Sequence, residues 1–271
     1  MFRFLCLGSG SSGNCYYLES NNKAILIDAG IGIRQFKKAA KEYGINISYI
    51  MGILITHDHA DHIKAVGYLS GEYCLPVYTT ALIHEGIRRN YRTHKMINPA
   101  SVRFVEKDKA FNVADMTIMP FDIPHDSTEN IGYSISTNDV NDGVFTIMTD
   151  VGKPTSNIEE YVGKSNFIVI EANYDAEMLR NGKYPKMLQD RIRGGNGHMS
   201  NSQTAQVLAE NFHEKIRNVF LCHLSEENNH PELARKTIEF HLRKYGIIAG
   251  KDFELEVLKR RVPTGFFELK L

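Results

Sequence analysis

The sequence lacks several features that would place it in a specialised class of protein. Its 271 residues contain no stretch close to the roughly 20 apolar residues that a membrane-spanning helix needs. The first residues turn polar after position 7, too early for the apolar region and cleavage site of a signal peptide. The 4 cysteines show neither CxxC nor framework spacing. We therefore expect a cytoplasmic protein with reduced thiols and no membrane partner.

An excess of positive charge is also absent. The chain carries 32 Lys and Arg against 32 Asp and Glu, so its net charge does not indicate a polyanionic partner. Two basic clusters do occur, Arg88, Arg89 and Arg92 in one and Lys259, Arg260 and Arg261 in the other. No linker or low-complexity tract divides the chain, and its composition is that of an ordinary globular protein. We predict one domain spanning residues 1–271.

The densest chemical signal is the segment THDHADH at residues 56–62. It places His57, His59, Asp61 and His62 within six consecutive positions. Imidazole nitrogens and carboxylates bind Zn²⁺, Mn²⁺ or Fe²⁺ at neutral pH. The apolar run Ile50 to Ile55 just before them is typical of a buried strand, so the ligands fall where a strand ends. A set of solvated histidines in a turn is the alternative.

Four more short apolar runs end in the same way. Each is followed by an acid or a histidine: 24–27 by Asp28, 116–123 by His125, 144–148 by Asp150, and 219–222 by His223. A single aspartate after a strand is usually a turn former. The repeated choice of Asp and His instead indicates that several strand ends contribute to one reactive centre.

Periodicity predicts helices between the strands. We expect them over residues 34–43 before Gly44, from Thr79 or Thr80 to Asn90, over 202–215, and over 231–245. An antiparallel start is predicted for strands at 2–7, 16–19 and 24–27. These patterns alone support an α/β or an α+β fold.

The motifs together resemble those of metallo-β-lactamase-fold hydrolases. The HxHxDH motif lies at His57 to His62, and the chain is most similar to the YycJ/WalJ group of exonucleases within that superfamily. The matching segments are SGSSGN at 9–14, EANYD at 171–175, GHMSN at 197–201 and CHLSEENN at 222–229. The resemblance implies an α+β fold, a four-layer αββα sandwich with helices outside two facing sheets.

The same resemblance implies a dinuclear metal centre. It assigns His57, His59 and His125 to one ion, Asp61, His62 and His223 to the other, and Asp150 to a bridge between them. Asp28 is then the carboxylate that orients a ligand histidine. Two divalent ions per chain are expected, Zn²⁺ or Mn²⁺ first and Fe²⁺ or Mg²⁺ as alternatives. A single ion on the first three histidines would leave Asp150 and His223 unexplained.

A second pair bears on the substrate. Glu171 follows the strand-like run 166–170, and His198 follows a glycine-rich stretch before the predicted helix at 202. They resemble the glutamate and histidine of tRNase Z and related phosphodiesterases, in which the histidine contacts the scissile phosphate. We predict Asp61, Glu171 and His198 as catalytic residues. The predicted substrate-binding residues are Ser9, Ser11, Asn14, Arg191 and Arg193. The alternatives are that Glu171 is a salt-bridge partner and His198 an exposed loop residue, that the two arginines form a solvated surface pair, and that residues 9–14 form a tight turn between strands.

These expectations lead to one main functional hypothesis. The chain is a metal-dependent phosphodiesterase acting on nucleic acid, and the subgroup resemblance implies a 5′→3′ DNA exonuclease in which a metal-bound hydroxide attacks phosphorus. The alternatives are hydrolysis of a small phosphodiester such as a cyclic nucleotide, a lactamase or thioesterase activity, and a non-catalytic module that retains the fold. The residues leave open DNA against RNA, the metal and the oligomeric state.

Overall fold

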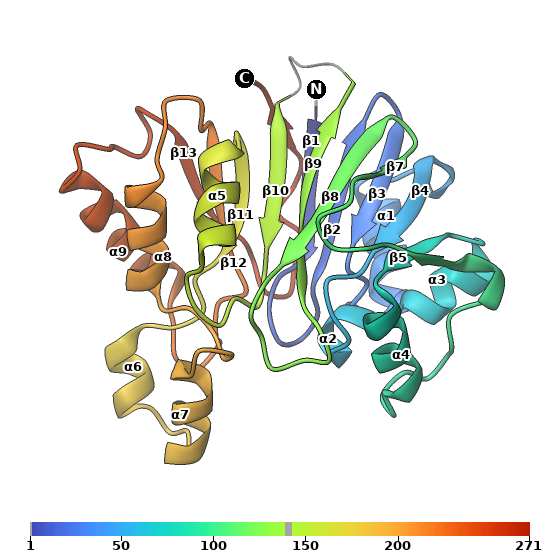
Figure 1. Cartoon of the computed structure of the whole chain (residues 1–271), viewed down its shortest axis with the longest axis horizontal. Helices are drawn as coiled ribbons and strands as arrows, with labels where there is room; N and C mark the ends of the chain where they lie inside the picture. Colours follow the sequence, from blue (N-terminus) through green and yellow to red (C-terminus); the bar gives the residue numbers. More distant parts are fainter. Residues whose placement is uncertain (1, 139–142) are drawn as a thin grey trace.

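Two seven-stranded β-sheets face each other in the computed structural model, which describes residues 2–138 and 143–271 (Figure 1). The first sheet has the spatial order β14 (Phe267–Leu269), β1 (Phe2–Gly8), β2 (Cys15–Ser20), β3 (Lys23–Ile27), β4 (Ile50–Leu54), β5 (Val77–Thr79) and β6 (Val102–Phe104). The second has the order β13 (Glu254–Val257), β12 (Asn218–Cys222), β11 (Phe167–Glu171), β10 (Val144–Met148), β9 (Ile131–Thr137), β8 (Met116–Asp122) and β7 (Phe111–Val113).

Helices lie outside the sheets, which gives the expected αββα layering (Figure 1). The helices of the first half are α1 (Ile33–Glu42), α2 (Ala60–Ile63), α3 (Val66–Glu72) and α4 (Ala81–Arg89), with 3₁₀ turns η1 (Ile47–Tyr49) and η2 (Pro99–Ser101). Those of the second half are α5 (Ser156–Lys164), α6 (Ala176–Asn181), α7 (Lys186–Arg193), α8 (Asn201–Glu210) and α9 (Pro231–Arg243). Within the part of the chain that the structure describes, none of these helices is long and apolar enough to cross a bilayer.

Aromatic side chains join the two sheets. Phe4 of β1 is fully buried, and its ring centroid lies 5.2 Å from that of Phe145 in β10 and 5.0 Å from that of Phe220 in β12. Such tilted pairs add to the stabilisation that comes from removing apolar area from water. A second core cluster, which includes Ile168 and Leu208, fills the space between the second sheet and α5, α8 and α9. Both faces of the second sheet are therefore buried, and its central strands β10, β11 and β12 consist mostly of apolar residues.

Strand direction brings the predicted reactive residues to one edge. β3 and β4 are parallel, and so are β10, β11 and β12. β8 and β10 both pair antiparallel with β9, so they also run in the same direction. The carboxyl ends of all these strands meet at the lower edge in Figure 1, next to α2, α6 and α7.

The helix predicted over 202–215 is too long. α8 ends at Glu210, and Asn211 closes it by donating its N–H to the carbonyl of Val207. Phe212 lies just beyond the helix but still packs on the core, 5.6 Å from the ring of Phe253. The helices α2, α3, α5, α6 and α7 and the strands β5, β13 and β14 were not predicted, because such short segments carry little periodicity.

Candidate metal centre

The reactive side chains leave the sheets at sharp turns. Asp28 follows β3, Asp150 lies two residues beyond β10, and His223 directly follows β12. All three have left-handed backbone conformations, with φ of 58°, 55° and 53°. This region is unfavourable for residues with a Cβ, although aspartate and histidine enter it more often than most. Each strand therefore ends in a bend that turns its last side chain into the shared edge.

Three imidazoles from two different loops converge at this edge. Donor nitrogens of His57, His59 and His125 lie within 4.8 Å of one another. The ring centroids of His57 and His59 are 4.6 Å apart, and that of His125 lies 5.2 Å from His57 and 5.0 Å from His59. The chain thus gathers the three histidines that were predicted to bind one ion, although His57 and His125 are 68 positions apart in the sequence.

A second group lies beside the first. Asp61, His62 and His223 also place donor atoms within 4.8 Å, and the Oδ2 atom of Asp61 lies 3.8 Å from His62 Nε2 and 3.6 Å from His223 Nε2. Asp150 stands between the groups. Its Oδ2 is 3.2 Å from His62 Nε2 in the second group, and its Oδ1 is 3.7 Å from His125 Nε2 in the first. This is the position that a bridging carboxylate requires.

The outer ring nitrogens of four histidines are held by the protein. His62 Nδ1 lies 2.7 Å from Asp28 Oδ2, and His57 Nδ1 lies 3.0 Å from the Thr56 hydroxyl, which in turn donates to Asp28. His125 Nδ1 lies 3.0 Å from the Gly197 carbonyl, and His223 Nδ1 lies 3.0 Å from Glu171 Oε1. These partners require a proton on Nδ1, so Nε2 is the nitrogen of each ring that can bind a metal.

The free nitrogens are buried without a protein partner. Nε2 of His57, His125 and His223 has no hydrogen bond in the described structure. A buried polar atom without a partner is costly, and three such atoms facing two carboxylates at one edge are explained by cations. Mixed imidazole and carboxylate donors suit divalent ions such as Zn²⁺ and Mn²⁺. The residues therefore fit a divalent metal centre.

The electrostatics of the metal-free site follow from burial and from the mixture of charges. Burial and the neighbouring His62 lower the pKa of His57 well below its usual value. Burial opposes a charge on His62 too, yet Asp28 and Asp150 raise its pKa to about 10. Burial likewise opposes ionisation of Asp150, but His223 and His62 hold the pKa of this carboxyl well below its usual value. A metal that binds to His62 must therefore displace a proton.

Glu171 and His198 form the predicted pair. His198 Nδ1 lies 2.8 Å from Glu171 Oε1, and the histidine is partly exposed while the glutamate is fully buried. Burial lowers the pKa of His198, but the facing carboxylate more than offsets it and raises the pKa above its usual value. The same Oε1 atom also lies 3.0 Å from His223 Nδ1. Glu171 thus orients both His198 and a candidate metal ligand, a double contact that the sequence did not indicate.

The predicted substrate-binding residues divide into two kinds. Ser9 and Asn14 are fully buried, which argues against direct contact with a substrate. The Ser9 hydroxyl accepts the backbone N–H of His223, and the Asn14 amide lies 2.9 Å from His62 Nε2. Arg193 forms an ion pair with Asp190. Ser11 and Arg191, by contrast, line hollows next to the candidate ligands.

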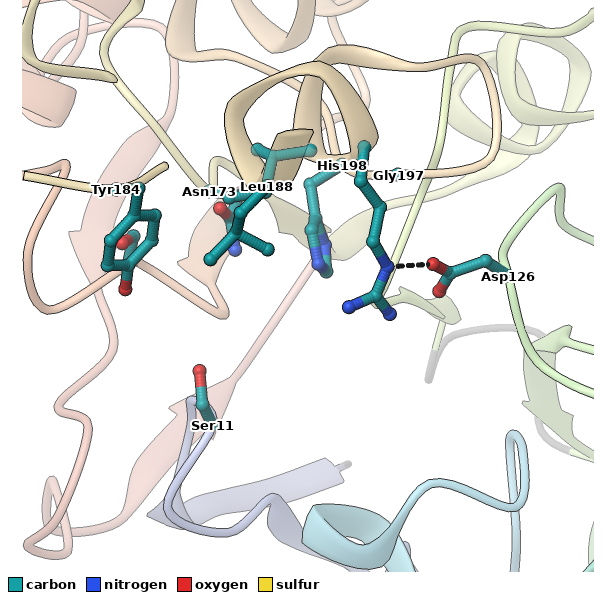
Figure 2. A pocket seen from close by; sticks show the side chains of 10 residues that line it. Ser11, Asp126, Asn173, Tyr184, Leu188, Gly197 and His198 are labelled. Carbon is teal, nitrogen blue, oxygen red and sulfur yellow. Dashed lines mark hydrogen bonds and ion pairs between the residues drawn. The ribbon is translucent and has the colours of Figure 1, made fainter. Parts of the chain in front are cut away.

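Three adjoining hollows surround the candidate metal centre. The central hollow, of about 450 Å³, is lined by His59, Asp61, Asp150, His198 and His223 among others. A small pocket of about 170 Å³ opens beside His198 and includes Tyr184, Leu188 and Asn173, with Ser11 facing them from the N-terminal half (Figure 2). A basic pocket of about 540 Å³ lies beside Asp61 and includes Arg34, Lys64, Arg92 and His94. Ser11 lines all three.

Some residues of the site carried no recognisable signal. Thr56 precedes the histidine motif, and nothing in its identity indicated the hydrogen bonds to Asp28 and His57. Asp58 lies within the motif but turns away, and it accepts hydrogen bonds from the N–H and hydroxyl of Thr128, three residues after His125. It therefore ties the two histidine loops together. The spacing of the motif could have suggested that one of its acids has such a role.

Comparisons with known proteins agree with this geometry. Residues 23–223 match the family model described as "Beta-lactamase superfamily domain". The chain is 32% identical over 263 residues to "Exodeoxyribonuclease YycJ" of Bacillus anthracis, covering 96% of this chain and 97% of that protein. It is 31% identical over 254 residues to "Exodeoxyribonuclease WalJ" of Streptococcus pneumoniae, covering 94% and 93%. The fold is similar to the crystal structure of the metallo-β-lactamase fold protein YhfI from Bacillus subtilis, with a TM-score of 0.70, 16% identity, and coverage of 97% and 98%.

Proposed function

Because this chain belongs to the β-lactamase superfamily, in the group that contains YycJ and WalJ, we propose that it is a dinuclear-metal-dependent 5′→3′ DNA exonuclease. The family match supports a metallo-hydrolase, and the exonuclease names of the two relatives support a nucleic acid as its substrate. The names of the two relatives, exodeoxyribonucleases that align over nearly their full length, support DNA. The convergence of seven candidate ligands next to the Glu171–His198 pair is the observation that carries the proposal.

Each part of the site has a distinct role in the proposed reaction. Two divalent ions, when bound by His57, His59, His125, Asp61, His62, His223 and Asp150, supply an activated water and offset the negative charge of the phosphodiester. Asp28 and Thr56 hold the outer nitrogens of His62 and His57, so both rings keep one orientation. Asp28 and Thr56 are buried, so water reaches the candidate metal centre from the central hollow.

His198 provides the proton that the leaving oxygen needs. Hydrolysis breaks the bond between phosphorus and the 3′ oxygen, water adds its oxygen to phosphorus, and the leaving oxygen must gain a proton. Glu171 accepts from Nδ1 of His198, which leaves Nε2 for the substrate, and the raised pKa lets the ring hold a proton near neutral pH. General acid assistance of this kind contributes about 10²–10⁴ in rate.

The position of His198 also supports the polarity. His198 lines the small pocket, so the group that leaves with the 3′ oxygen lies on that side (Figure 2). In 5′→3′ digestion this group is the terminal nucleotide, whereas in 3′→5′ digestion that yields 5′-mononucleotides it is the remaining polymer. A pocket of about 170 Å³ beside Tyr184 and Leu188 suits the end of a strand better than a continuing one.

The test is a nuclease assay on DNA and RNA labelled at one end, single- and double-stranded, with Mn²⁺, Mg²⁺ or Zn²⁺. We expect release of short products from the 5′ end of DNA, and no cleavage by Asp150→Ala. Bis(p-nitrophenyl) phosphate serves as the small diester. If only that compound is hydrolysed, with no digestion of labelled DNA, the exonuclease proposal is wrong and a small-phosphodiester hydrolase replaces it.

A further inference from the structure

The exposed cations of this neutral chain are not equivalent. Most arginines near the site are neutralised by carboxylates: Arg88 and Arg89 both contact Glu85 at 2.7 Å, and Arg191 contacts Asp126 at 2.5 Å. Arg34, Lys64 and Arg92, which line the basic pocket, have no carboxylate partner within residues 2–138 and 143–271. Lys64 donates to the Ser12 carbonyl, and Arg92 donates to the hydroxyl of Tyr91. Three cations without a carboxylate partner therefore line one pocket.

The basic pocket begins at the candidate metal centre. Ser11, Ala60, Asp61 and Arg92 line both the basic pocket and the central hollow, so the two are continuous. Asp61 is the acid that lines the basic pocket, and it is also a candidate metal ligand. The pocket lies on the N-terminal half of the chain, whereas the small pocket beside His198 is formed mainly by the C-terminal half (Figure 2).

A helix end adds to the positive potential. α1 begins at Ile33, and Gly32, Ile33 and Arg34 all line the basic pocket. The N-cap residue Gly32 provides no capping side chain, and the first turn contains no acid. The first N–H groups of this ten-residue helix are thus available to an anion, in the same pocket as the three unpaired cations.

An exposed aromatic ring stands at the junction of the two hollows. Tyr91 is 85% exposed, lines the central hollow, and has the guanidinium of Arg92 at 5.5 Å from its ring centre. Unpaired cations alternating with an exposed ring are typical of surfaces that bind a single strand by its phosphates and bases. A single phosphate group would not need cations spread over a pocket of this size.

We propose that the basic pocket binds the backbone of the DNA strand that remains after cleavage, with phosphates at Arg34, Lys64 and Arg92 and a base stacked on Tyr91. The inference rests on the proposed nuclease function and adds the path of the polymer. The strand enters over the basic pocket, crosses the candidate metal centre, and ends in the small pocket. Three unpaired cations in one pocket would give a chain with no net charge a local site for a polyanion.

The test compares Arg34→Gln/Arg92→Gln with a control of equal charge, Arg217→Gln/Lys251→Gln. The control cations are also exposed and unpaired with carboxylates in the described structure, and they lie where β12 and β13 begin, at the edge opposite the metal centre. Metal-loaded proteins are titrated with fluorescent single-stranded DNA whose terminal linkages are phosphorothioates that block digestion. Affinity is measured over a series of KCl concentrations.

We expect the slope of log K against log[KCl] to become shallower by about 1.4 in Arg34→Gln/Arg92→Gln, because each lost phosphate contact on a single strand removes about 0.7. Affinity at low salt should fall about tenfold or more, and the control should match the wild type. Tyr91→Ala should also weaken binding about tenfold while Tyr91→Phe does not, since stacking needs only the ring.

Three results would overturn the inference. The slope could remain that of the wild type, the control could lose as much affinity as the test variant, or hydrolysis of bis(p-nitrophenyl) phosphate could fall by the same factor as binding. The last result would place the arginines at the scissile phosphate. Binding is measured without digestion, so it can be judged apart from the nuclease function. If the wild-type protein cleaves no DNA but Arg34→Gln/Arg92→Gln still shows the shallower slope, the binding pocket is retained and only the nuclease function is rejected.

Discussion

Replacing Glu171 by glutamine should damage the site more widely than removing His198. The buried carboxylate has contacts on both oxygens. Oε2 accepts the backbone N–H groups of Val151 and Met199, at 2.9 and 3.2 Å. Oε1 faces Nδ1 of both His198 and His223, at 2.8 and 3.0 Å. All four partners donate to the carboxylate when the imidazoles carry a proton on Nδ1.

An amide cannot satisfy this arrangement. Because the backbone N–H groups can only donate, the amide oxygen of Glu171→Gln must take the Oε2 position, and its NH₂ group then faces the two imidazoles. Two donors cannot share a hydrogen bond, so His198 and His223 must move their remaining proton to Nε2 or turn away. A proton on Nε2 of His223 removes the lone pair that a metal needs.

The magnitudes follow from the two lost functions. Loss of an outer hydrogen bond to a ligand histidine typically costs about 10–100-fold in metal affinity. Loss of a general acid costs about 10²–10⁴ in rate. Glu171→Gln should lower both the reaction rate and the affinity for one of the two ions. His198→Ala should lower only the reaction rate and keep both ions at wild-type affinity.

Metal content after dialysis, titration with a chelator, and the rate of DNA digestion at saturating metal separate the two effects. The reasoning is refuted if Glu171→Gln binds both ions as tightly as the wild type, because the contact with His223 would then have no function. It is also refuted if His198→Ala loses an ion. Donor atoms of Asp150, Glu171, His198 and His223 lie within 4.8 Å of one another, so that result would make His198 a ligand.

Three further outcomes are expected. Asp28→Asn should weaken metal binding about 10–100-fold in chelator competition, because its NH₂ group would face His62 Nδ1 at the present 2.7 Å contact; unchanged affinity would contradict the role of Asp28. In the metal-free protein the proton on His62, whose pKa is raised from 6.5 to about 10, stabilises the fold fully below pH 6.5, and this contribution is lost as the pH rises to about 10. The melting temperature of the metal-free form should therefore fall over that range more than that of the loaded form, and parallel curves would argue against it. Phe4→Ala, which removes the ring contacts with Phe145 and Phe220, should lower the free energy of unfolding in urea by about 3–5 kcal/mol. A decrease below about 1 kcal/mol would show that neighbouring side chains fill the space.

The sequence indicated candidate ligands that the structure brings together, because most of them follow a short, strongly apolar strand. A run such as residues 219–222 is buried on both faces, and the polar residue that follows it, His223, stands out without knowledge of its neighbours. The layering of the fold came from the family resemblance, since periodicity does not reveal which strands become adjacent. The order of the sheets joins β1 to β14 across almost the whole chain, a contact that no local pattern contains.

Substrate contacts are harder to predict from sequence, because they depend on which partner each polar group finds in the folded chain. Arg88, Arg89 and Arg92 form one cluster in the sequence, but helix geometry gives Arg88 and Arg89 the shared partner Glu85 and leaves Arg92 free beyond the end of α4. Ser9 is a hydroxyl in a glycine-rich loop, like Ser11, yet the first is fully buried and the second exposed. Residue type and local sequence therefore do not distinguish a buried serine from an exposed one.

Three residues with left-handed backbone conformations explain why some polar residues near the site are buried. Asp28, Asp150 and His223 occupy a backbone region that costs about 1–2 kcal/mol for most residues, so the neighbouring structure must hold them there. The Asp28 N–H donates to the Leu54 carbonyl, the Asp150 carbonyl accepts from the Asn130 amide, and the His223 N–H donates to the Ser9 hydroxyl. The buried polar residues Ser9 and Asn130 therefore act on the strained strand ends from within the protein. A serine that looks like a phosphate contact in the sequence instead fixes the backbone of a candidate metal ligand, and strain at three strand ends is what aims the carboxylates and the imidazole at one point.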